Sequence, residues 1–153
     1  MPAPYAGRCL CGAIEYRLTD EPVTYYACHC TNCQKRSGSG FALSMWVKRA
    51  ALEVTTGEPV RAVTKAVDGT PRYYRDCGQC GVRLWSEPAR FPELAVLRPA
   101  TLDDPKQFTP VLHMWTQSAL PWVRIPEGAA SYAKQVGGID ELARLWRERT
   151  KPS

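Results

Sequence analysis

The seven cysteines of this 153-residue chain fall into three groups rather than being scattered. They occur as Cys9-Leu10-Cys11, Cys28-His29-Cys30-Thr31-Asn32-Cys33 and Cys77-Gly78-Gln79-Cys80. An odd number of cysteines cannot pair completely as disulfides within one chain. Thiolates at such short spacings are typical of metal coordination, above all of Zn²⁺, which takes sulfur ligands in a tetrahedral arrangement. The cysteines are therefore predicted to be metal ligands.

The pair Cys77 and Cys80 has the spacing of a metal-binding turn. Gly81 can take the positive φ that a sharp turn needs, and backbone amides in such a turn can point at the sulfur atoms. The flanking segments 72–76 and 82–86 look like hairpin strands, whereas a thioredoxin-like redox pair would need a βαβ context. The spacing thus favours a metal site over a redox pair.

Cys9 and Cys11 are predicted to complete the same site. If the chain is extended there, alternate residues face one way, so both sulfurs could reach one ion while Leu10 enters the core. A closed structural zinc site requires four ligands, and Cys77 with Cys80 supplies the other two. Such binding is worth about 10–16 kcal/mol in peptides, so loss of one ligand should unfold the chain.

Cys28, Cys30 and Cys33 form a group of three, with no fourth cysteine left to join them. Catalytic zinc keeps three protein ligands and leaves one position for water or substrate, which an exogenous thiolate would suit. His29 and His113 are the two histidines, and either could close this site instead. In an extended chain the ring of His29 would face away from its neighbours and could carry a proton. His113, in an apolar strand, is expected in the core or a pocket wall.

The residues that follow this group directly could bind a substrate. Lys35, Arg36, Ser37 and Ser39 offer cations and hydroxyls that could receive substrate carboxylates near the open metal position. A solvated loop is the alternative interpretation. The run of small residues over 37–40 is expected to be loop.

Strands are expected to dominate the elements that position these residues. Apolar Ile14, Tyr16 and Leu18 alternate with polar residues, which predicts a half-buried strand. Strands are predicted over 14–18, 23–28, 41–47, 52–56, 60–67, 72–76, 82–86, 94–97 and 111–116. The exception is 138–150, where apolar residues recur at three- and four-residue steps, with acidic residues first and arginines last, as a helix dipole favours. The fold class is all-β with a peripheral C-terminal helix.

The composition supports one globular domain of ordinary character. An apolar content of 44% with 23% charged residues excludes wholesale disorder. There is no apolar run of membrane-spanning length and no evident export signal, so a cytoplasmic protein without membrane contact is expected. The formal charge is +5, but seven thiolates would add −7 and two zinc ions +4, leaving about +2. The basic residues are not clustered, so no nucleic-acid partner is expected.

Several of these motifs resemble one family. They are Gly7-Arg8-Cys9-Leu10-Cys11-Gly12, the Cys28–Cys33 group with Ser37-Gly38, Cys77-Gly78-Gln79-Cys80-Gly81 with Leu84-Trp85, and the segment from His113 to Pro126 with Ala119-Leu120-Pro121-Trp122. Together they are similar to the glutathione-dependent formaldehyde-activating enzymes, a family that includes the centromere protein V domain. The resemblance covers residues 5–132, which leaves 133–153 as a C-terminal helical extension.

The resemblance implies an Mss4-like, zinc-stabilised β fold with two Zn²⁺ per chain. It implies a structural ion on Cys9, Cys11, Cys77 and Cys80, and a catalytic ion on Cys28, Cys30 and Cys33. The namesake reaction joins formaldehyde to glutathione, so a carbon–sulfur lyase acting on a small thiol and an aldehyde adduct is expected. Two alternatives stay open. One is a non-catalytic module that binds protein or nucleic acid, with a histidine completing the second site; the other is a redox sensor.

Overall fold

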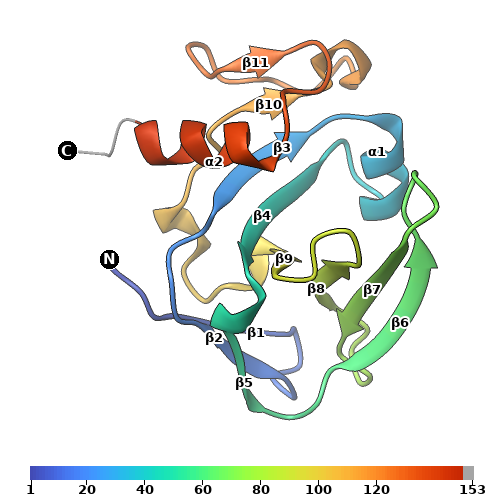
Figure 1. The fold of residues 1–153 in the computed structure, drawn as a ribbon, viewed down its shortest axis with the longest axis vertical. Helices are drawn as coiled ribbons and strands as arrows, with labels where there is room; N and C mark the ends of the chain where they lie inside the picture. Colours follow the sequence, from blue (N-terminus) through green and yellow to red (C-terminus); the bar gives the residue numbers. More distant parts are fainter. Residues whose placement is uncertain (150–153) are drawn as a thin grey trace. The chain divides into compact units, whose positions relative to one another are not determined.

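The computed structural model describes residues 1–149 and shows a mainly β protein with two α-helices (Figure 1). The predicted fold class is thereby confirmed. The chain divides into two compact units, one formed by Met1–Pro22 with Met45–Phe108 and the other by Val23–Ser44 with the chain from Thr109 onward. Within residues 1–149 no helix has the length and apolar character needed to cross a membrane.

The first unit begins with a three-stranded antiparallel sheet in the order β1 (Tyr5–Arg8), β2 (Glu15–Leu18) and β5 (Leu52–Thr56). The alternation predicted around β2 is confirmed, because Ile14, Tyr16 and Leu18 are all buried. Strand β1 was not expected from the sequence. Its four residues are too few for a period-two pattern to stand out, and it includes a glycine, which is rare in strands.

The same unit contains a second antiparallel array. Its strands pair in the order β4 (Ala42–Lys48, paired from Met45 on), β9 (Leu94–Leu97), β8 (Arg83–Pro88), β7 (Pro71–Asp76) and β6 (Val60–Lys65). Trp85 is fully buried and lies edge-on to Tyr16, with ring centroids 6.0 Å apart. The register of β7 and β8 shifts between Arg75 and Asp76, immediately before the second cysteine pair.

The second unit is built around parallel pairing. Strand β10 (His113–Met114) lies between β3 (Thr24–Cys28) and β11 (Ser131–Tyr132), and every residue of β3 is buried. The C-terminal helix α2 (Ile139–Glu148) packs on β3, as Figure 1 shows, and Trp146 meets Tyr25 with ring centroids 6.4 Å apart. The helix predicted over 138–150 is therefore present; Thr150 lies outside the described residues.

One helix was not anticipated. Residues Thr31–Ser37 form α1, which starts inside the Cys28–Cys33 group and ends at Gly38 in a left-handed conformation. Ser37 thus belongs to a helix, and the expectation that 37–40 is entirely loop was wrong at this residue. The sequence gives no apolar stripe here, since α1 buries none of its residues. Periodicity cannot reveal a helix that has no core-facing side.

The close approach of β1 to β2 makes Gly7 a test of the packing. A Cβ atom at Gly7 would overlap the ring of buried Tyr16. Because overpacking forces shifts in the surrounding core, Gly7→Ala should lower the free energy of unfolding by about 1–3 kcal/mol in urea melts. Ala6→Ser, on the exposed neighbour, is the control and should change it by less than about 0.5 kcal/mol. Equal stability of the two variants would contradict the packing described for Tyr16.

Candidate metal centres

Cys9, Cys11, Cys77 and Cys80 come together as a four-cysteine centre, with all four sulfur atoms within 4.8 Å of one another. The Sγ atom of Cys11 lies 3.7 Å from that of Cys9 and 3.7 Å from that of Cys77. A tetrahedron with metal–sulfur bonds of 2.3 Å has edges of about 3.8 Å. The donor set therefore fits Zn²⁺ in type, number and spacing.

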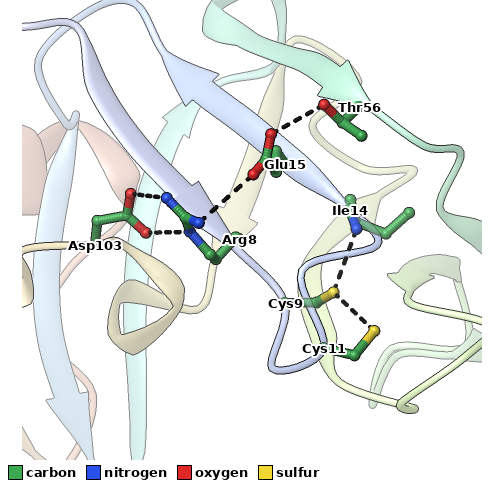
Figure 2. Close-up of polar contacts among 7 residues, drawn as sticks. All are labelled: Arg8, Cys9, Cys11, Ile14, Glu15, Thr56 and Asp103. Atoms are coloured by element: carbon green, nitrogen blue, oxygen red, sulfur yellow. Dashed lines mark hydrogen bonds and ion pairs between the residues drawn. The ribbon is translucent and has the colours of Figure 1, made fainter.

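The chain brings Cys9 and Cys11 together by a turn, not by an extended strand. β1 ends at Arg8, the Gly12 amide donates to the Cys9 carbonyl at 3.2 Å, and Gly12 takes a φ of +79°. The expectation that Leu10 enters the core was wrong, because Leu10 is 85% exposed at the tip of this turn. A turn places both sulfurs on one side without strand alternation. Figure 2 shows the Ile14 amide donating to the Cys9 sulfur, at 3.3 Å.

The second pair lies in the turn between β7 and β8, as predicted. The Gly81 amide donates to the Cys77 carbonyl at 2.9 Å, and Gly81 has a φ of +75°. The amides of Gln79 and Cys80 point at the Cys77 sulfur, at 3.4 Å and 3.5 Å. Amide donors of this kind stabilise a thiolate more than a thiol, so the turn favours the form that binds metal.

Cys80 and Cys11 of this centre differ in pKa. Backbone hydrogen bonds from Val82 and Cys11 lower the pKa of Cys80 to about 6. A backbone hydrogen bond at Ala13 lowers the pKa of Cys11, but burial and hydrogen bonds with the neighbouring sulfurs outweigh it and raise the pKa to about 11. At neutral pH the centre is thus partly ionised, and metal binding would release the remaining protons.

An ion-pair network holds the ends of β1 and β2, which flank the turn that contains Cys9 and Cys11 (Figure 2). Arg8 donates to both carboxylate oxygens of Asp103, at 3.0 and 2.9 Å, and lies 3.6 Å from the carboxylate of Glu15. Thr56 donates to Glu15 at 3.0 Å. These groups are exposed, and pairs of this kind contribute at most about 1 kcal/mol each. Their effect is to hold the register of β1, β2 and β5 beside Cys9.

Cys28, Cys30 and Cys33 form a three-cysteine centre, with sulfur atoms within 4.8 Å of one another. Cys28 ends β3 and is buried, whereas Cys30 and Cys33 at the start of α1 are half-buried. The sulfur of Cys30 caps α1 by accepting from the Cys33 amide at 3.3 Å. A hydrogen bond with Cys28, together with burial, raises the pKa of the Cys33 thiol well above its usual value. A cation bound nearby would favour the ionised form of Cys33, because opposite charges attract.

Neither histidine joins this sulfur group within the described part of the chain. His29 is fully buried, and its Nε2 atom lies 3.0 Å from Nδ1 of His113. Its ring also packs against Phe41, with centroids 5.1 Å apart. Burial lowers the pKa of both imidazoles, and the charge of His113 lowers that of His29 further. Burial thus favours the neutral form of both rings, which are hydrogen-bonded to each other.

The expected substrate contacts lie on α1. Lys35 and Arg36 are exposed in its last turn, so these cations belong to a helix and not to a loop. Ser37 is engaged internally: its hydroxyl donates to the Cys33 carbonyl at 2.7 Å and accepts from the Ser39 amide at 3.2 Å.

Sequence reasoning overlooked Gln34, whose amide nitrogen donates to the carbonyls of His29 and Ser118, each at 2.9 Å. No spacing rule could have identified it, because Ser118 is 84 residues away along the chain.

The chain is similar in sequence to proteins of one enzyme family. The sequence model of the family described as "Glutathione-dependent formaldehyde-activating enzyme" matches residues 4–118. A curated protein of Emericella nidulans, whose name assigns it provisionally to the same enzyme, is 32% identical over 77 residues. That alignment covers 50% of this chain and 38% of the relative's length. A crystal structure of a Rhodobacter sphaeroides protein superposes with a TM-score of 0.49 at 20% identity, covering 83% of this chain and 98% of the other.

The two centres should differ in what they do for stability. Cys11 and Cys77 are 66 positions apart, whereas the three-cysteine centre spans six residues, and cross-linking a longer loop constrains the unfolded chain more. Cys80→Ser should therefore lose one zinc equivalent and the cooperative thermal transition. Cys33→Ser should lose zinc but keep the transition. Metal analysis with thermal melts measures both; equal destabilisation by the two substitutions would contradict this division.

Proposed function

The chain belongs to the glutathione-dependent formaldehyde-activating enzyme family, and from this premise we propose that it is a zinc-dependent enzyme of the carbon–sulfur lyase type. Its substrates would be a small thiol resembling glutathione and an aldehyde, or the adduct of the two. The observation that carries the proposal is the three-cysteine centre, whose donor group includes neither His29 nor His113. A cytoplasmic location is part of the proposal, because free zinc-binding thiols persist in reducing compartments.

Two Zn²⁺ ions per chain are proposed, a structural one on the four-cysteine centre and a catalytic one on Cys28, Cys30 and Cys33. The catalytic ion would supply an electropositive position that lowers the pKa of a bound thiol or water. The residues present fit it, because three thiolates are the number that catalytic zinc sites take from the protein. The cap that Cys30 makes on α1 orients its sulfur toward the start of the helix.

In the proposed reaction the carbon–sulfur bond forms between the thiol sulfur and the aldehyde carbon, and the thiol proton ends on the aldehyde oxygen. The reverse direction breaks the same bond and returns the proton to sulfur. His29 is the proposed proton carrier. Its buried Nδ1 atom has no hydrogen-bond partner among residues 1–149, and a buried N–H without an acceptor is rarer than an unpaired lone pair. We therefore place the proton of His29 on Nε2, donated to His113, which leaves Nδ1 able to accept.

Lys35 and Arg36 are the proposed anchors for substrate carboxylates. Both are exposed on the turn of α1 that follows Cys33, so they can meet a charged substrate at the protein surface. Ser37 was expected beside them as a contact. The Ser37 hydroxyl is hydrogen-bonded to Cys33 and Ser39, and we propose that it holds the end of α1 in place.

The anchors can be tested with thiols of different charge. In Co²⁺-substituted protein, the spectrum should change at millimolar glutathione and also with uncharged 2-mercaptoethanol. Lys35→Ala with Arg36→Ala should weaken the response to glutathione about tenfold, because two exposed charge pairs worth about 0.7 kcal/mol each are lost. The response to 2-mercaptoethanol should not change. Lys134→Ala, an exposed cation elsewhere in the second unit, is the control. Equal weakening for both thiols would argue against anchoring.

Turnover tests the reaction itself. The zinc-loaded protein should accelerate both formation and breakdown of thiol–aldehyde adducts, and Cys33→Ser should abolish this while the protein stays folded. Rates can be followed by NMR with glutathione and formaldehyde, against the uncatalysed reaction. A Co²⁺ spectrum that thiols leave unchanged, together with no rate enhancement, would favour the non-catalytic binding module instead.

A further inference from the structure

We propose that Gln34 is a positioning residue that sets the metal affinity of the three-cysteine centre. It does so by holding the chain between Cys28 and Cys30 against the segment that contains Ser118. This inference rests on the proposed function, since it requires that the centre bind Zn²⁺. Gln34 itself touches neither metal nor substrate in this proposal; it acts through the backbone.

The contacts of Gln34 use both hydrogens of its amide nitrogen. One is donated to the carbonyl of His29 and the other to the carbonyl of Ser118, each at 2.9 Å. The His29 carbonyl lies between two proposed ligands, Cys28 and Cys30. Gln34 itself follows the third ligand, Cys33. A single side chain thus connects the ligand-bearing backbone to a distant part of the same unit.

The helix that carries Gln34 depends on such connections. α1 has seven residues and buries none of them, and helices this short are marginal in water by themselves. The cap at Cys30 and the bonds of Ser37 tie α1 to its own flanks. The bond to Ser118 ties it instead to the chain that follows β10. Removing that bond would therefore free the helix, and with it Cys33, to shift relative to β3.

His29 takes part in several of the hydrogen bonds that hold this segment in place. Its amide donates to the Met114 carbonyl at 3.0 Å, its ring is hydrogen-bonded to His113 at 3.0 Å, and its carbonyl accepts from Gln34. Rotation of the peptide after His29 would move Cys30 relative to Cys28. A centre with three protein donors lacks a fourth protein ligand that would restrain such a movement. Groups that orient ligands from outside the coordination shell then contribute strongly to affinity.

The partner segment is shaped to present the Ser118 carbonyl. Trp115 takes a φ of +58°, a left-handed conformation that costs a non-glycine residue roughly 1–2 kcal/mol. The chain then turns through residues Thr116–Ser118, and the Ser118 amide donates to the Trp115 carbonyl at 3.0 Å. The Trp115 indole nitrogen donates to Gln135 at 3.2 Å. This turn, held at Trp115, brings the Ser118 carbonyl to the amide of Gln34.

The test compares zinc affinity at the two centres. Gln34→Met keeps the length of the side chain and removes both donors, and Gln34→Glu removes them in an isosteric side chain. Competition with a chromophoric chelator should resolve two releases of zinc from the intact protein. In both variants we expect the dissociation constant of the three-cysteine centre to rise about 10–100-fold, with the four-cysteine centre unchanged. Gln117→Met, on the exposed neighbour of Ser118, should alter neither.

The possible outcomes distinguish a failure of this inference from a failure of the proposed function. If the unsubstituted protein releases one equivalent of zinc instead of two, the proposed function fails. If it releases two and Gln34→Met leaves both constants unchanged, the role of Gln34 is refuted while the function stands. Weakening of both centres together, with a lower melting temperature, would show a general structural effect and also refute it. Weakening by Gln34→Glu alone would assign the effect to added charge, and that too would refute it.

Discussion

The approach of Cys11 to Cys77 to within 3.7 Å is the contact on which the first unit depends. It brings the turn after β1 to the turn after β7, and a metal bound by these sulfurs would join two segments that are 66 positions apart along the chain. Four sulfurs at this spacing suit one tetrahedral ion, and they repel one another as thiolates if no ion is present. The same geometry therefore fits a metal ion, and the structural role that we propose for this ion is to stabilise the fold.

The second unit also brings cysteines together, but it positions them in a different way. Its three sulfurs come from one short stretch that ends a buried strand and starts an exposed helix. Proximity along the chain makes the cluster easy to form, but it also leaves the cluster weakly supported. The hydrogen bond between His29 and His113, the parallel pairing of β10 with β3 and the bonds of Gln34 provide that support from residues remote in sequence. The two centres are thus held in different ways, which agrees with the different roles that we propose for them.

The sequence predicted the strands well where burial is one-sided. Around β2 the alternation of apolar and polar residues corresponds to the two faces of the strand, so Tyr16 and Leu18 were placed in the core correctly. The hairpin turn at Cys77 and the C-terminal helix were predicted for similarly local reasons. Where local chemistry was ambiguous, prediction failed. The pair Cys9 and Cys11 fits either a strand or a turn, and only the structure shows the turn that exposes Leu10.

The grouping of the cysteines was determined by sequence alone, because metal ligation depends on donor type and on spacing over a few residues. So was the class of fold, since strand periodicity is likewise a property of neighbours along the chain. Tertiary structure decided that His29 bonds to His113 instead of joining the sulfurs, and that Gln34 reaches Ser118. Each of those contacts joins residues 84 positions apart. Such contacts are set by how strands pair and turn, and no local pattern encodes which distant carbonyl or ring will lie within reach.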